Sequence, residues 1–170
     1  RVLFRSTASS KVYKVDLAAS PLGVSEISLQ SPNTFGVLGG FTVDPSTLTM
    51  FYSEQDSYLL KSLDLSSSSL VPQTIAGIKG LNGNLDGTVS VALLNQPGDL
   101  VLNGFKDRIY FIDGSSIRSL NLTPSKVSGE LEISTISGDP GRTGILHGED
   151  RKSTRLNSSH SSVSRMPSSA

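Results

Sequence analysis

Short runs of alternating apolar and polar residues recur along the chain, and each run ends in a cluster of Gly, Pro, Asn, Asp or Ser. Alternation with a period of two is typical of β-strands that bury one face, and such clusters are typical of turns. No segment keeps a helical period, and the stretch most open to a helical interpretation, 89–94, is soon closed by Pro97. The pattern therefore predicts an all-β protein.

Two long segments of this pattern match each other, and equivalent positions lie 57 to 61 residues apart. Half a copy precedes them, with strands predicted at 12–17 and 25–29. The predicted strands of the two full copies are, in order, 41–44, 49–53, 59–65 and 73–77, and then 100–103, 108–113, 117–122 and 134–138.

A repeat of roughly 50–60 residues with four strands is typical of a β-propeller blade, and a blade must stack on its neighbours to bury both faces of its sheet. We expect an incomplete β-propeller of about two and a half four-stranded antiparallel blades: a half blade at 7–32, a blade at 33–79, a linker and blade at 80–138, and the start of the next crossover at 139–149. The residues expected to fill the space between blades are Met50, Tyr52, Leu63 and Leu65, with their counterparts Ile109, Phe111, Leu120 and Leu122.

Both ends of the chain are predicted to be non-native. Residues 150–160 match, letter for letter, the translation of a short-read sequencing adapter, and 164–170 match its continuation. The reverse complement of the start of the same adapter encodes residues 1–6. Fusion scars are excluded from fold reasoning, which leaves 7–149 as the native insert and 150–170 as an expected disordered tail.

These ends distort the formal net charge, which is zero for the whole chain. Removing their six basic residues and one acidic residue from totals of 15 each leaves nine basic and fourteen acidic residues, a net charge of −5. Because an acidic surface repels phosphate backbones, nucleic acid is not the expected partner. The chain has no cysteine, which excludes a disulfide framework and a Cys-ligated zinc site. The insert also has no apolar run near the roughly 20 residues that a transmembrane helix needs.

The linker GLNGNLDGTVSVALLNQPGDLVL, at 80–102, is the most distinctive native stretch. It resembles the inter-blade signature of the NHL-repeat family of six-bladed β-propellers through Gly80, Gly83, Asp86, Gly87, Ala92, Leu94, Asn95, Pro97 and Gly98. Asp86-Gly87 is expected to form a tight turn, and Pro97 is expected at a strand start, where its missing N–H is tolerated. The earlier blade lacks the Asn-x-Pro lead-in, and IYFID at 109–113 also approximates the motif of YWTD-type propellers, so both families stay open.

The resemblance implies a non-catalytic scaffold that binds a protein or a small ligand through surface loops and needs no cofactor. The predicted binding-loop residues are Glu54, Gln55, Asp56 and Tyr58, and Phe105, Lys106, Asp107 and Arg108. Two alternatives stay open: a propeller enzyme, a lyase or hydrolase, with channel residues in further blades, and an extracellular receptor propeller of the YWTD type. The compartment is not fixed by the sequence, although an extracellular location is favoured.

Candidate catalytic and metal-binding residues are few. Asp44 and Asn103 follow the inner strands, where some propellers bind a divalent cation through side-chain oxygens. Asp44 precedes Pro45 and Asn103 precedes a glycine, so we expect both side chains to cap turns. His147 is the only histidine of the insert, whereas a metal-dependent lyase needs several histidines that converge. We therefore predict no catalytic, metal-binding or cofactor-binding residue in the insert.

Overall fold

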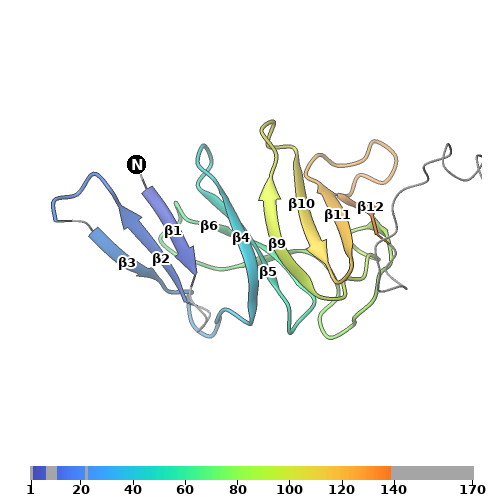
Figure 1. Cartoon of the computed structure of the whole chain (residues 1–170), viewed down its shortest axis with the longest axis horizontal. Helices are drawn as coiled ribbons and strands as arrows, with labels where there is room; N and C mark the ends of the chain where they lie inside the picture. Colours follow the sequence, from blue (N-terminus) through green and yellow to red (C-terminus); the bar gives the residue numbers. More distant parts are fainter. Residues whose placement is uncertain (1, 7–10, 22, 139–170) are drawn as a thin grey trace, which may run out of the picture.

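The computed structural model describes residues 2–6, 11–21 and 23–138, and these form three antiparallel sheets that stand side by side (Figure 1). The first sheet has the order β1 (Val2–Ser6), β2 (Val12–Asp16), β3 (Gly23–Ile27). The second has the order β4 (Leu38–Asp44), β5 (Thr49–Glu54), β6 (Leu59–Asp64), β7 (Gln73–Ala76). The third has the order β8 (Gly87–Thr88), β12 (Glu132–Ser137), β11 (Ser116–Asn121), β10 (Arg108–Asp113), β9 (Pro97–Leu102).

The all-β prediction is confirmed, since these ranges contain no helix, and the two matching segments fold alike. In the second sheet β4, β5, β6 and β7 are neighbours in chain order, as are β9 to β12 in the third. The cross-strand pairs are also equivalent: Met50 lies opposite Leu63, and Ile109 lies opposite Leu120. Each inner strand carries an irregularity near its start, between Leu38 and Gly40 in one copy and opposite Phe111 to Asp113 in the other.

Two strands, β1 and β8, lie outside the predicted strands. β1 belongs to the segment predicted to be non-native, yet it pairs with β2 over five residues and completes a three-stranded first sheet. β8 is added to the outer edge of the third sheet, where Gly87 pairs with Ile133. The prediction of a tight turn at Asp86-Gly87 is therefore wrong, because Gly87 is the first residue of β8. The crossover at 139–149 and the tail at 150–170 lie outside the described residues.

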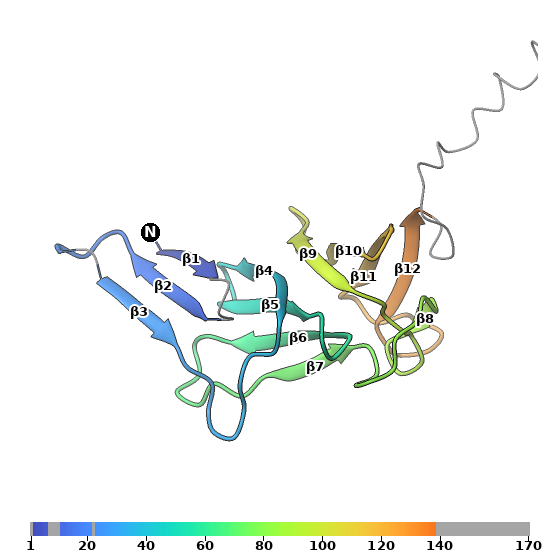
Figure 2. The ribbon, with the colours of Figure 1, turned by 60° about the horizontal axis from the view of Figure 1, so that its bottom comes forward.

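The core lies between the sheets, not within any one of them, and Figure 2 shows the three sheets following one another in chain order. One buried cluster joins the first sheet to the second: Val12, Ile27, Met50, Tyr52 and Leu63. The other joins the second to the third: Leu60, Ala76, Ala92, Leu94, Leu100, Ile109, Phe111, Leu120 and Ile133. Of the eight residues predicted between the blades, six are buried, and Leu65 and Leu122 are partly buried against these clusters. Stacking thus supplies most of the apolar burial that stabilises the fold.

Two glycines end the fourth strands in the same backbone conformation. Gly77 follows β7 with φ of 88°, and Gly138 follows β12 with φ of 92°. A Cβ at Gly77 would lie 2.2 Å from the carbonyl oxygen of Tyr58, and one at Gly138 would lie 2.5 Å from that of Ser115. Both the positive φ and the close approach require glycine, so the fourth strand is followed by the same backbone conformation in the second and third sheets.

Candidate functional site

Two turns of neighbouring sheets meet at one end of the molecule. The β4–β5 turn begins after Asp44, whose Oδ1 accepts hydrogen bonds from the Ser46 backbone N–H at 2.9 Å and from its hydroxyl at 2.7 Å. The β9–β10 turn begins after Asn103, whose Oδ1 accepts bonds from the backbone N–H groups of Asp107 and Arg108. The prediction that Asp44 and Asn103 cap turns is confirmed.

Lys106 joins these two turns. Its Nζ lies 2.9 Å from Asp44 Oδ1 and donates a hydrogen bond to Ser46 Oγ at 2.6 Å. The hydrogen bond from Lys106, aided by those from Ser46, holds the pKa of Asp44 well below its usual range. We call this surface, residues 45–48 and 103–107, the turn platform. Both turns lie at the top of the ribbon in Figure 1.

The turn platform carries exposed apolar side chains. Phe105 at the tip of the β9–β10 turn is 89% exposed, and Leu48 in the β4–β5 turn is 43% exposed. The loop between β11 and β12 lies at the same end, since Leu122 donates a backbone hydrogen bond to the Asp107 carbonyl at 2.7 Å, and its Val127 is 98% exposed. Lone exposed apolar residues are ordinary, but an exposed aromatic residue on a braced turn is typical of a contact residue.

The second predicted binding loop, Glu54–Tyr58, lies at the opposite end, because a β5–β6 turn and a β9–β10 turn fall at opposite ends of stacked antiparallel sheets. Glu54 is 3% exposed. Its carboxylate forms an ion pair with Lys61 at 2.7 Å and accepts hydrogen bonds from the Ser57 hydroxyl and the Gly36 N–H. Glu54 is therefore turned inward and braces the chain, so it is not free to contact a ligand. The structure does not bring the two predicted loops together.

A buried ion network centres on Arg118, which sequence reasoning missed. Arg118 is fully buried, and its Nη1 donates hydrogen bonds to Asp113 Oδ2 at 2.6 Å and to the Leu93 carbonyl at 2.7 Å. Its Nη2 lies 2.8 Å from both Asp86 Oδ1 and the Leu85 carbonyl. The network therefore fixes the crossover that leads into β9.

The two carboxylates of the network attach the crossover to strands of the third sheet. Asp113 Oδ1 accepts backbone hydrogen bonds from Asn95 and Gln96, each at 2.8 Å. Asp86 Oδ2 accepts one from the Thr135 N–H at 2.7 Å. Burial raises the pKa of Asp86, but the hydrogen bonds from Thr135 and Arg118 outweigh burial and hold it below the ordinary value.

The signal that could have identified this network lies in the repeat. Glu54 and Asp113 each end the second strand of their sheet, and Lys61 and Arg118 take the equivalent place on the third strand, opposite Tyr52 and Phe111. An acid and a base at matching positions of both copies predict a structural ion pair.

The other predicted residues have structural surroundings. Pro97 begins β9, as predicted, and Ala92 and Leu94 are fully buried in the cluster between the second and third sheets. No group of three or more His, Asp or Glu side chains suited to a metal ion occurs in the described ranges. Within those ranges, no helix has the length and apolar character needed to cross a bilayer. His147 lies outside them.

No family model and no curated protein sequence matches the chain. An auxiliary nutrient binding protein from Bacteroides thetaiotaomicron aligns with 81% of the chain at 16% identity and a TM-score of 0.56, and one from Bacteroides ovatus aligns with 81% at 17% identity and a TM-score of 0.59. A B. thetaiotaomicron protein of unknown function aligns with 82% at 15% identity and a TM-score of 0.62. The chain has the fold of an incomplete β-propeller. It spans 33% of the length of each of these three structures, and identity at this level establishes the fold alone.

Proposed function

We propose that this incomplete β-propeller is part of a non-catalytic, NHL-repeat-like binding scaffold that contacts its ligand through the turn platform. The observation that carries the proposal is the link from Lys106 to Asp44 and Ser46, which ties turns of two neighbouring sheets together beside an exposed Phe105. A braced turn loses little conformational freedom on binding, so more of the contact energy of Phe105 remains as affinity.

The buried charges support a scaffold over an enzyme. Glu54, Asp113 and Arg118 are buried at the crossovers, and each is engaged in structural ion pairs and hydrogen bonds, with only Nε of Arg118 left without a partner among the described residues. Catalytic acids and bases instead point at a cleft with a lone pair or proton free for substrate.

Two observations favour a binding role and bear on the class of ligand. Two structurally similar proteins are auxiliary nutrient binding proteins, which favours a nutrient as the ligand. The linker at 80–102 carries the NHL-like residues quoted above, which favours a role in binding. We therefore assign the chain a small ligand or peptide that packs an apolar surface against Phe105.

Chemical-shift mapping tests the proposal. The ¹⁵N-labelled chain is titrated with a panel of mono- and disaccharides, free amino acids, and one acidic and one basic peptide. We expect shift changes in residues 45–48 and 103–107 with at least one probe, and their loss in Phe105→Ala. Leu81→Ala, which removes an apolar side chain of 54% exposure from the crossover, is the matched control and should leave them unchanged.

Two results would contradict the proposal. Shift changes confined to 55–58 would place binding at the opposite end of the sheets. Conversion of a probe into a new compound, followed in the same spectra, would show that the chain is catalytic.

A further inference from the structure

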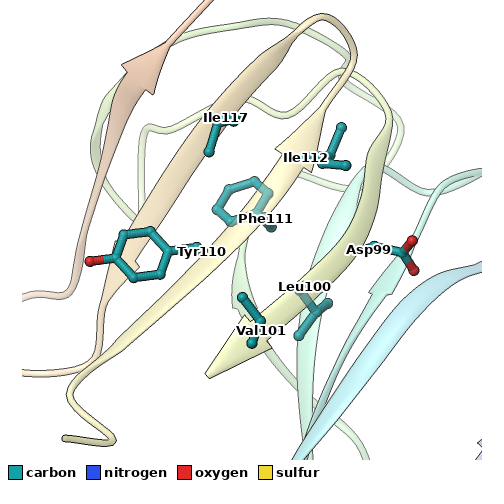
Figure 3. A pocket seen from close by; sticks show the side chains of 7 residues that line it. All are labelled: Asp99, Leu100, Val101, Tyr110, Phe111, Ile112 and Ile117. Carbon is teal, nitrogen blue, oxygen red and sulfur yellow. The ribbon is translucent and has the colours of Figure 1, made fainter. Parts of the chain in front are cut away.

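Two hollows with mainly apolar walls lie in different surroundings. One is on the outer face of the third sheet, which is uncovered among the described residues, and Figure 3 shows the side chains that line it, including Ile117. The equivalent residue of the second sheet, Leu60, is covered by the third sheet, so this face belongs to the stacking already described. The other hollow lies between the first and second sheets, and stacking does not account for its chemistry.

This inter-sheet hollow has a volume of about 310 Å³. Its apolar walls are Ile27 of the first sheet, Leu48, Leu65 and Leu70 from the turns and loops of the second sheet, and Phe4 of β1. Phe4 belongs to the segment predicted to be non-native, whereas the other four walls belong to the insert. Pockets for small molecules have volumes of roughly 300–1,000 Å³, so the hollow is large enough for one short apolar chain or ring.

Lys14 supplies a positive charge at the inter-sheet hollow. It lies on β2 two residues after the buried Val12, and alternate residues of a strand share a face, so it lies on the face that packs against the second sheet. Its side chain is exposed and forms no ion pair or hydrogen bond within the described ranges. Glu26 also lines the hollow, but its carboxylate pairs with Lys11 at 3.0 Å. The ammonium group of Lys14 is therefore available to a ligand.

The fold does not require a lysine at this position. The equivalent residues, two positions after Leu60 and Ile117 on the third strands of the other sheets, are Ser62 and Ser119. A small hydroxyl side chain thus satisfies this position in two sheets. The positive charge of Lys14 needs a reason other than stacking.

We propose that the inter-sheet hollow binds a small carboxylic acid with an apolar chain or ring, its carboxylate paired with Lys14 and its apolar part packed against Leu48, Leu65 and Leu70. This site is separate from the ligand contact assigned above to Phe105. Because Lys14 is exposed, the carboxylate lies at the mouth of the hollow, where it forms a charge-assisted hydrogen bond without losing all of its hydration. The apolar part gains free energy by leaving water. An amine or an alcohol of the same length lacks the ion pair.

Titration of the ¹⁵N-labelled 170-residue chain with octanoate tests the proposal. Octylamine and octan-1-ol have the same chain length with a different head group, and N-acetylleucine represents the C-terminal residue of a peptide. Shift changes in residues 14, 25–27, 65 and 70 report on the hollow and give the Kd. Lys14→Gln removes the charge and Lys14→Glu reverses it. Lys126→Gln, which changes an exposed lysine between β11 and β12, is the matched control.

We expect octanoate to bind at least about tenfold more tightly than octylamine, and Lys14→Gln to weaken octanoate binding about tenfold, as the loss of one hydrogen bond between charged groups implies. Lys14→Glu should reverse the preference, so that octylamine binds more tightly than octanoate. Lys126→Gln and Phe105→Ala should leave the Kd for octanoate unchanged.

Several results would overturn the proposal. Equal binding of octanoate by the parent chain and Lys14→Gln would show that the carboxylate is not recognised by Lys14, and the absence of shift changes at the hollow up to about 10 mM octanoate would show that nothing of this class binds there. Tighter binding of N-acetylleucine than of octanoate would make a peptide C-terminus the occupant. Loss of octanoate binding in Phe105→Ala would move the ligand to the turn platform.

Discussion

Replacement of Arg118 tests whether the buried ion network holds the crossover in place. Arg118→Met keeps much of the side-chain volume but removes the guanidinium that contacts Asp113, Asp86 and two carbonyl oxygens. Removing one partner of a buried ion pair destabilises a protein by about 3–5 kcal/mol, because the remaining charge stays buried. Asp113 keeps two backbone hydrogen bonds, which soften this loss. We therefore expect the free energy of unfolding to fall by about 3 kcal/mol, at the lower end of that range.

Two further variants separate charge from packing. Arg118→Lys keeps a cation but cannot reach Asp113 and Asp86 together, so we expect about half of the loss seen with Arg118→Met. Arg108→Met removes an arginine that forms no ion pair within the described ranges, and we expect a change within about 0.5 kcal/mol. Urea unfolding followed by circular dichroism measures all three variants.

Hydrogen exchange distinguishes a local effect from a global one. In Arg118→Met the amide groups of Asn95 and Gln96 should lose protection before those of β10, since both donate to Asp113. The reasoning would be refuted if Arg118→Met were as stable as the parent chain, or if both variants of Arg118 lost equal amounts. The first result would mean that the guanidinium contacts contribute little beyond packing, and the second that a cation at this position recovers none of their stabilisation.

Three other changes have defined outcomes. The Tyr52 hydroxyl is buried without a hydrogen-bond partner among the described residues, so Tyr52→Phe should raise the free energy of unfolding by about 1 kcal/mol in urea titrations. Leu60→Ala, at the covered interface, should lower it by about 2–5 kcal/mol, whereas Ile117→Ala on the uncovered face should change it by less than about 1 kcal/mol. The folded-state pKa values of Asp44 and Asp86 lie below the ordinary carboxyl value, so their stabilisation is complete above pH about 4 and is lost as the pH falls through the folded pKa. The urea concentration at the unfolding midpoint should therefore fall when the pH is lowered below about 4. The fall should be smaller in Asp44→Asn than in the parent chain, and a fall of equal size would show that Asp44 does not contribute.

The repeat predicted most of the fold because its strands obey local rules. Alternation with a period of two placed the second strands at 49–53 and 108–113, and the structure has β5 and β10 at Thr49–Glu54 and Arg108–Asp113. The outer edge of the third sheet could not be predicted in this way. β8 has two residues, too few for any alternation, and it forms because Asp86 is held by Arg118 and Thr135 beside β12.

Only the part of the candidate site that depends on local sequence could be predicted. Turn chemistry identified Asp44 and Asn103, since an Asx cap depends on residues two to five positions away. The link from Lys106 to Ser46 joins residues of different blades, and nothing in the local sequence of either turn encodes it. Likewise, in the sequence Glu54 resembles a solvent-exposed turn residue. In the structure it is buried, and its carboxylate accepts a hydrogen bond from the backbone N–H of Gly36, which is far away in the sequence.

The repeated acid–base pair explains how two crossovers of different sequence reach the same inner strand. In the second sheet Glu54 accepts the N–H of Gly36, just before β4, and Lys61 neutralises it. In the third sheet Asp113 accepts two N–H groups just before β9, and Arg118 neutralises it. A carboxylate at the end of each second strand thus fixes the start of its own inner strand, whatever residues the crossover contains. Since the contacts to Asp113 are made by the backbone N–H groups of Asn95 and Gln96, they do not depend on the side chains at these two positions, whereas they do depend on the acid and on the base that neutralises it.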